Sequence, residues 1–193
     1  MTQEQHASKL APRGHIIALA GKMGSGKDTV AAMLRMVGYQ RIGFGDALRR
    51  EVAMAGTRRD GYGYPPDRSD AICAGEIRAE EVYRKPTSDR MRLLFQFHGT
   101  DLRRAADENY WVSALHADLH AGRKYCITDL RFQNEVDYVR GRGGTVWALT
   151  GRCHKGAGAN HVSEKLDIHA DVVIDNSVPM FELAGQVIEA LAR

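Results

Sequence analysis

The residues best suited to chemistry stand near the start of the chain, in the segment Gly21-Lys22-Met23-Gly24-Ser25-Gly26-Lys27-Asp28. Glycines at these spacings let the backbone wrap around an anion, with successive N–H groups pointing inward. An apolar run of strand type precedes the segment and a helical pattern follows it, so the positive end of a helix dipole lies beside the turn. Strand, glycine-rich turn and helix together predict a phosphate-binding loop for a nucleoside triphosphate, in which Lys27 reaches the outer phosphates.

Asp28 departs from the usual form of this loop, which has Ser or Thr at that position to offer a hydroxyl to Mg²⁺. Two roles are open for the carboxylate. It could hold Mg²⁺ directly or through water, because hard cations prefer oxygen ligands. Alternatively it only stabilises the positive end of the helix, and Thr29 or water serves the metal.

A second acidic residue, Asp129, ends the apolar segment Tyr125-Cys126-Ile127-Thr128. Phosphate-loop enzymes place an acidic residue there to hold Mg²⁺, usually through waters. The alternative is a cap on the next helix. Arg131 follows at the same predicted edge and could bind a phosphate with two parallel hydrogen bonds. The alternative for Arg131 is a surface ion pair with Glu135.

A polar tract, Gln-Phe-His-Gly-Thr-Asp at 96–101, interrupts a mostly apolar helical pattern. Gln96 followed by a helix break at Gly99-Thr100 favours recognition of a ligand, and a satisfied helix end is the alternative. Trp111 lies shortly afterwards in the tract Tyr-Trp-Val. It either belongs to the core or stacks on a base.

Strand and helix patterns alternate along the chain. Strands are predicted at 16–20, 39–45, 125–128, 145–149 and 172–174, and helices at 28–37, 47–55, 71–84, 88–98, 108–121, 133–141 and 180–191. Residues 56–70 and 151–160 are predicted loops. This alternation predicts an α/β fold with a five-stranded parallel sheet flanked by helices on both faces. Ligands of such sheets bind beyond the carboxyl ends of the strands.

Composition places the chain among ordinary globular proteins. Its 193 residues are 44% hydrophobic and 26% charged, with a formal net charge of +3, which predicts one domain over 15–193 after a disordered leader at 1–14. Apolar runs are too short to cross a bilayer, and the small charge speaks against nucleic-acid binding. Three widely spaced cysteines (Cys73, Cys126 and Cys153) favour a reducing, cytoplasmic compartment over a disulfide framework.

Seven tracts, in order along the chain, resemble the phage-type deoxynucleoside monophosphate kinases, which have a P-loop kinase fold. They are Gly-Lys-Met-Gly-Ser-Gly-Lys-Asp-Thr (21–29), Phe-Gly-Asp-Ala-Leu-Arg (44–49), Gln-Phe-His-Gly-Thr-Asp (96–101), Tyr-Trp-Val (110–112), Thr-Asp-Leu-Arg-Phe-Gln-Asn-Glu (128–135), His-Val-Ser-Glu (161–164) and Ile-Asp-Asn (174–176). Asp after Gly-Lys is a feature of that family. The resemblance implies transfer of the γ-phosphate of ATP, with Mg²⁺, to a deoxynucleoside 5′-monophosphate.

The same resemblance assigns roles residue by residue. It implies a helical monophosphate-binding region at 46–110 and a short lid at 151–164. Residues 22–28 hold the ATP phosphates, Asp28 and Asp129 are the candidate metal ligands, and Lys27, Asp129, Arg131 and the lid residue Arg152 are the candidate catalytic residues. Lys155 is a second lid candidate, by topological analogy. Residues that would face the monophosphate are Asp46, Arg49, Gln96, Gly99, Thr100, Trp111, Arg131 and Glu164.

Two other functions are compatible with parts of the sequence. An animal-type phosphomevalonate kinase also shows Gly-Lys-Asp after the glycine-rich loop, together with Tyr-Trp-Val-like and Asp-x-Arg tracts. A non-catalytic or DNA-associated nucleotide-binding protein is the alternative of another class. The expected partner is a small-molecule monophosphate, with no nucleic acid and no membrane, and a homodimer is a possible assembly.

Overall fold

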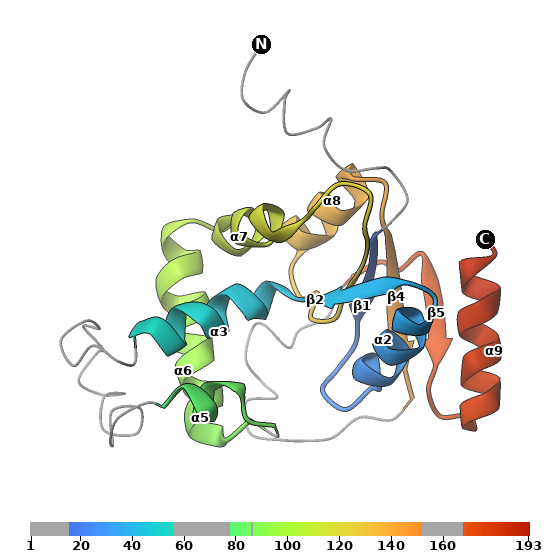
Figure 1. Ribbon diagram of the computed structural model, residues 1–193, viewed down its shortest axis with the longest axis horizontal. Coiled ribbons are helices and arrows are strands. Elements are labelled where there is room, and N and C mark those ends of the chain that lie inside the picture. Colours follow the sequence, from blue (N-terminus) through green and yellow to red (C-terminus); the bar gives the residue numbers. More distant parts are fainter. Residues whose placement is uncertain (1–15, 56–77, 86, 152–167) are drawn as a thin grey trace, which may run out of the picture. The chain divides into compact units, whose positions relative to one another are not determined.

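The structure, a computed structural model, describes residues 16–55, 78–85, 87–151 and 168–193 (Figure 1). Strands and helices alternate along these residues. The strands are β1 (Ile16–Ala20), β2 (Tyr39–Ile42), β3 (Lys124–Ile127), β4 (Thr145–Thr150) and β5 (Val172–Asp175). The helices are α2 (Lys27–Met36), α3 (Phe44–Ala55), α5 (Ala79–Tyr83), α6 (Asp89–Gln96), the π-helix η1 (Phe97–Arg104), α7 (Tyr110–Asp118), α8 (Gln133–Gly141) and α9 (Met180–Leu191).

The five strands form one parallel sheet in the order β2-β3-β1-β4-β5. The central strand β1 aligns Ile17 with Cys126 of β3 on one side and with Thr145 of β4 on the other. Every residue of β1 is buried, as expected for a parallel strand that is covered on both faces. The predicted α/β architecture is therefore confirmed, and the segments that follow the strands begin at a common edge of the sheet.

Helices cover the two faces of this sheet. On one face, alternate strand residues pack with α2 and α9 in a core of Ile17, Leu19, Val30, Ala31, Leu34, Tyr39, Cys126, Trp147, Leu149, Ile174, Leu183, Val187 and Ala190. The other face is covered by α8, which contacts β1 and β4 and buries Val136 and Val139. This packing fixes the start of α2, and so the predicted phosphate loop, against the sheet edge.

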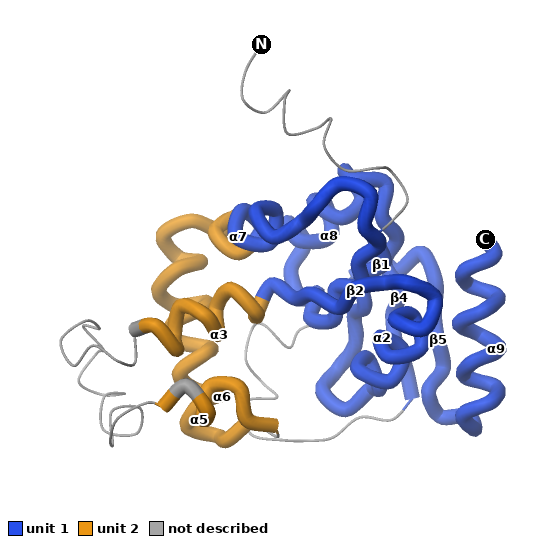
Figure 2. Tube along the Cα trace, in the orientation of Figure 1, with its two compact units in different colours: residues 1–44, 112–193 blue, residues 45–111 orange. Residues whose placement is uncertain are grey.

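The chain divides into two compact units, which Figure 2 shows in different colours. The first unit comprises residues 1–44 and 112–193 and carries the sheet. The second unit comprises residues 45–111 and contains most of α3, together with α5, α6 and η1. It has an apolar cluster of its own, made of Val52, Val82, Met91, Leu94 and Phe97. The helical region expected at 46–110 falls within this unit.

The strand predicted over 39–45 is wrong at its end. It stops at Ile42, and Phe44 begins α3. The physical reason is a distant carboxylate: Asp129 Oδ1 accepts the Phe44 N–H at 2.9 Å, which stabilises a helix start at that position. Gly43 leaves room for this approach, because a Cβ there would lie 2.8 Å from both Asp129 carboxylate oxygens.

The helix predicted over 88–98 also differs, because no break occurs at Gly99-Thr100. α6 passes directly into the π-helix η1, which continues to Arg104. The helix predicted over 108–121 is shorter and spans Tyr110–Asp118, and 79–83 is the helical part of 71–84 among the described residues. Within the residues that the structure describes, no helix combines the length and the apolar character needed to cross a membrane.

Candidate functional site

The predicted phosphate loop lies between β1 and α2, at the carboxyl end of the central strand. Three of its glycines, Gly21, Gly24 and Gly26, have φ values of 153°, 79° and 92°. Residues with a side chain rarely adopt these backbone φ values, so the turn requires glycine at these positions. Gly26 is also the N-cap of α2, and its carbonyl accepts the Val30 N–H at 3.1 Å. The strand, turn and helix that the sequence predicted are therefore present.

Lys27 is the first residue of α2, and its ammonium group lies against the loop itself. Lys27 Nζ donates to the carbonyl oxygens of Gly21 at 2.5 Å and Lys22 at 2.8 Å, and lies 3.4 Å from Ser25 Oγ. Backbone carbonyls are neutral partners, so a phosphate oxygen would compete well for the same ammonium group. The cation is thus held where an anion bound in the loop could reach it.

Asp28 is exposed in the first turn of α2, near the end of β3. Its charge acts on the buried thiol of Cys126 in β3. Burial raises the pKa of that thiol to about 12, Arg41 opposes this shift, and the Asp28 carboxylate adds to it. The N-cap of α2 is Gly26, which has no side chain, and Asp28 is the acidic residue of the first turn. The exposed carboxylate suits either role left open by the sequence, a metal ligand or a charge that favours the helix dipole.

Asp129 lies just beyond β3, the strand next to β1, at the edge where the phosphate loop begins. Two hydrogen bonds hold the preceding residue, Thr128, against β2. Its N–H donates to the Ile42 carbonyl at 3.1 Å, and its Oγ1 accepts from Arg41 Nε at 3.2 Å. Among the described residues, no three His, Cys, Asp or Glu side chains gather as a ready metal cage. Mg²⁺ commonly needs only one or two carboxylates together with phosphate oxygens.

Glu135 explains the local path of the chain at Arg131. Its buried carboxylate accepts the backbone N–H of Arg131 at 2.8 Å and of Phe132 at 3.2 Å. It thereby satisfies donors at the start of α8, as a carboxylate in the first helical turn often does. These two hydrogen bonds fix the backbone just after β3, from which the half-buried Arg131 side chain extends.

In the second unit, the tract predicted for recognition forms the end of α6 and most of η1. Gln96 is the last residue of α6, while Gly99 and Thr100 lie within the π-helix. Gly99 is buried and its carbonyl accepts the indole N–H of Trp111 at 2.8 Å. A Cβ at Gly99 would lie 3.0 Å from a methyl group of Leu48 in α3, so glycine permits close packing of the two helices. Trp111 is itself 5% exposed.

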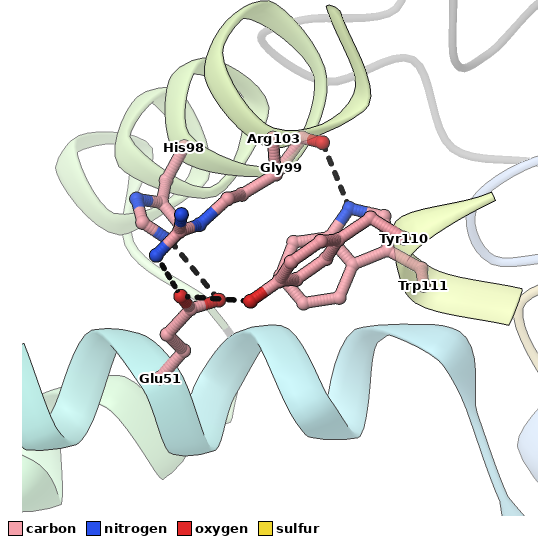
Figure 3. A network of polar contacts seen from close by, with 6 residues as sticks. All are labelled: Glu51, His98, Gly99, Arg103, Tyr110 and Trp111. Atoms are coloured by element: carbon pink, nitrogen blue, oxygen red, sulfur yellow. Dashed lines mark hydrogen bonds and ion pairs between the residues drawn. The ribbon is translucent and has the colours of Figure 1, made fainter. Parts of the chain in front are cut away.

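Glu51 of α3 gathers polar side chains from η1 and the start of α7 (Figure 3). Its carboxylate pairs with Arg103, accepts the Tyr110 hydroxyl at 3.2 Å and lies 3.4 Å from Nε2 of His98. The Arg103 guanidinium also lies 5.1 Å from the Tyr110 ring centre. Burial lowers the pKa of His98, whereas the hydrogen bond and charge of Glu51 oppose that shift.

Arg49, a predicted monophosphate ligand, also belongs to α3. Its guanidinium donates to the Val82 carbonyl of α5 and lies 4.6 Å from the centre of the Phe95 ring of α6. Asp46 stands in the first turn of the same helix. Arg49 therefore links three helices of the second unit. The lid candidates Arg152 and Lys155, and Glu164, lie outside the described residues.

The structure places the predicted residues in two groups. The first unit holds residues 22–28, Asp129 and Arg131, and the second holds Asp46, Arg49, Gln96, Gly99, Thr100 and Trp111. Sequence reasoning gave no role to Glu51, or to Asn176, whose side chain reaches the phosphate loop. The available signal for Asn176 was the tract Ile-Asp-Asn (174–176), which runs from the end of β5 into the turn that follows it. Glu51 carries no signal, because nothing local distinguishes it from a solvent-exposed helix residue.

Comparison with known proteins adds distant structural similarities. No protein-family model and no curated protein sequence matches the chain. Dephospho-CoA kinase from Campylobacter jejuni is 11% identical, with a TM-score of 0.47, over 93% of this chain and 96% of that one. TT1252 from Thermus thermophilus is 18% identical, with a TM-score of 0.48, over 94% and 97%. A gluconokinase from Sinorhizobium meliloti 1021 is 17% identical, with a TM-score of 0.44, over 95% and 94%.

Proposed function

We propose that the protein transfers the γ-phosphoryl group of ATP to a deoxynucleoside 5′-monophosphate, giving the diphosphate and ADP. The observation that carries the proposal is the glycine-rich loop at the end of the central strand, with Lys27 held on its carbonyls. Asp129 and Arg131 follow the adjacent strand β3, at the sheet edge where this loop begins. This is the place where open α/β sheets bind their ligands.

The residues of the first unit fit ATP and Mg²⁺. The positive φ values of Gly24 and Gly26 bend the loop so that N–H groups can face an anion, and the start of α2 adds its dipole. Lys27 would exchange the carbonyls of the loop for a phosphate oxygen. Asp28 and Asp129 carry the carboxylates suited to Mg²⁺. When bound, this ion would neutralise part of the negative charge of the phosphates.

The acceptor requires little acid–base help. A phosphate monoester is largely ionised at neutral pH, so its oxygen can attack without a strong general base. The task is to bring two anions together, align them and exclude water. Lys27, Arg131 and Arg49 are the cations that we assign to this task, and Arg152, which lies outside the described residues, is a further candidate.

The second unit is our candidate for acceptor recognition. Its tract 96–101 lies at the junction of α6 with a π-helix of 8 residues. Such helices are rare and occur frequently at functional sites. We assign Gln96 and Thr100, both partly exposed, to contacts with the monophosphate. Trp111 contacts this tract through the hydrogen bond that its indole N–H donates to the Gly99 carbonyl.

The decisive experiment measures ADP release from ATP–Mg²⁺ in a coupled assay, with one acceptor added at a time. The acceptors are dTMP, dGMP, dCMP, dAMP, phosphomevalonate and single-stranded DNA. Stimulation by at least one deoxynucleoside monophosphate is expected. Stimulation by phosphomevalonate alone would favour a kinase of a different phosphorylated small molecule, and stimulation by DNA alone would favour a DNA-associated ATPase. Either result overturns the proposal.

Lys27→Ala tests whether turnover depends on the loop. We expect most of the turnover to disappear while the circular dichroism spectrum stays that of the wild type, because Lys27 is a half-buried residue outside the apolar core. Lys124→Ala is the matched control. Lys124 is the first residue of β3, which runs parallel to β1, so it lies at the edge of the sheet opposite to the phosphate loop. Near-wild-type turnover in Lys27→Ala, or equal losses in both variants, would contradict the assignment.

A further inference from the structure

The turn that follows β5 reaches the phosphate loop through one side chain. Asn176 Nδ2 donates a hydrogen bond of 2.9 Å to the carbonyl oxygen of Ser25, a residue 151 positions earlier in the chain. Ser25 is 2% exposed, so this carbonyl needs a partner within the protein. We infer that Asn176 is a positioning residue, which holds the loop ready for the phosphates and acts on nucleotides through the phosphate chain rather than through the base.

Asn176 is itself held firmly by its neighbours. Its backbone N–H donates to the Thr150 carbonyl of β4 at 3.1 Å. The preceding Asp175 exchanges two hydrogen bonds with Gln186 of α9, at 2.8 and 3.0 Å. The Asp175 carboxylate also accepts the backbone N–H and the hydroxyl of Ser177, at 2.8 and 2.7 Å, and these two bonds lower its pKa. The turn is therefore anchored to a strand and a helix of the core before it touches the loop.

Two glycines leave room for this turn. Gly26 faces the Asn176 side chain, and a Cβ at Gly26 would lie 2.9 Å from Cγ of the amide. Gly151, just after β4, faces the turn from the other side. A Cβ there would lie 2.7 Å from the Ser177 nitrogen and 2.9 Å from Asp175 Oδ1. Both glycines also have a φ of 92°. The close approach of three separate segments thus depends on positions without side chains.

Fixing the Ser25 carbonyl has a direct consequence for anion binding. A peptide unit is planar, and in the trans form its C=O and N–H bonds point in opposite directions. The Ser25 carbonyl and the Gly26 N–H belong to the same peptide unit. When Asn176 holds the carbonyl on one side, the Gly26 N–H is directed to the opposite side. Asn176 thereby orients one donor of the loop in advance, which lowers the cost of ordering it when a phosphate binds.

The inference rests on the proposed use of ATP and is tested by comparing two ligands. Binding of ATP and of inorganic tripolyphosphate is measured by calorimetry for the wild type, Asn176→Ala and Asn176→Asp. Asn176→Ala is expected to lower the affinity for both ligands by the same factor, about 3- to 10-fold, which is the effect of losing one neutral hydrogen bond. Asn176→Asp keeps the side-chain volume, but its carboxylate cannot donate a hydrogen bond, so it should lower both affinities at least as much.

Gln133→Ala is the matched control, because it removes a side-chain amide from an exposed pair with Asp137 on α8. It should leave both affinities unchanged. Weaker ATP binding with unchanged tripolyphosphate binding would place Asn176 at the base or ribose and overturn the inference, as would unchanged affinity for both ligands. A wild type that binds tripolyphosphate but phosphorylates no acceptor would refute the proposed function alone. A wild type that binds neither ligand would refute both.

Discussion

Removal of the Glu51 carboxylate should destabilise the second unit more than most single substitutions on a helix. The carboxylate is 24% exposed and interacts with a partly exposed arginine (Arg103), a tyrosine hydroxyl and a fully buried histidine (His98) (Figure 3). In Glu51→Ala these groups lose their shared anion. Without Glu51, the positive charge of Arg103 lies beside the buried His98 with no carboxylate to balance it, which disfavours the protonated form of the imidazole.

The expected loss of stability follows from the contacts. Hydrogen bonds to charged groups contribute about 1.5–3 kcal/mol each. Arg103 is 39% exposed, so solvent screening reduces its share. We therefore expect Glu51→Ala to lower the free energy of unfolding by about 2–4 kcal/mol, and Tyr110→Phe to lower it by about 1 kcal/mol. For a chain of this length, about 3 kcal/mol corresponds to a fall in Tm of roughly 6–12 °C.

Tryptophan fluorescence can follow the second unit separately. The chain has two tryptophans, and Trp111 belongs to the second unit while Trp147 lies in β4. In a Trp147→Phe background, thermal and urea unfolding are recorded for Glu51→Ala, Tyr110→Phe and the double variant. Tyr110→Phe should cost little once Glu51 is gone, because the hydroxyl has lost its acceptor. A midpoint within about 1 °C of the parent for Glu51→Ala, or fully additive losses, would refute the reasoning.

The same variants have a predicted pH dependence. Because the folded-state pKa of His98 is lowered, the unfolded chain binds a proton there more tightly than the folded protein does. This contribution makes stability fall as the pH drops through the unfolded value near 6.5. Glu51 opposes the lowering, so its removal should enlarge the loss of stability at pH values below about 6.5. An equal loss in the two proteins would contradict this assignment of causes.

Two further predictions concern the first unit. Arg131→Ala should chiefly raise KM for the monophosphate while the secondary structure is kept, because the backbone N–H that donates to the Glu135 carboxylate is retained in the variant. Steady-state kinetics with an unchanged KM and kcat would remove Arg131 from the site. Asp28→Ser should shift the Mg²⁺ dependence of turnover if the carboxylate is a metal ligand. A Mg²⁺ titration identical to that of the wild type would instead assign Asp28 to the helix terminus.

Local patterns were enough to predict the elements that carry the phosphate loop. The apolar run at 16–20 and the helical pattern after Gly26 led to the correct strand, turn and helix. The alternation of strands and helices was enough for the parallel sheet and its covered faces. Local reasoning failed at Phe44, because the helix start there depends on Asp129, a residue 85 positions away. It also predicted a break at Gly99-Thr100, where packing against Leu48 and Trp111 accompanies a continuous π-helix.

The sequence by itself determined what a contiguous segment can determine. A loop such as 21–28 takes its shape from glycines and from the strand and helix beside it, so its chemistry can be inferred before any fold is known. The tertiary structure alone decided which distant groups support that chemistry. Asn176 meets Ser25, and Glu51 meets His98 and Arg103, because crossover connections and helix packing bring their backbones together. No local preference encodes such pairs, since each partner alone is an ordinary polar residue.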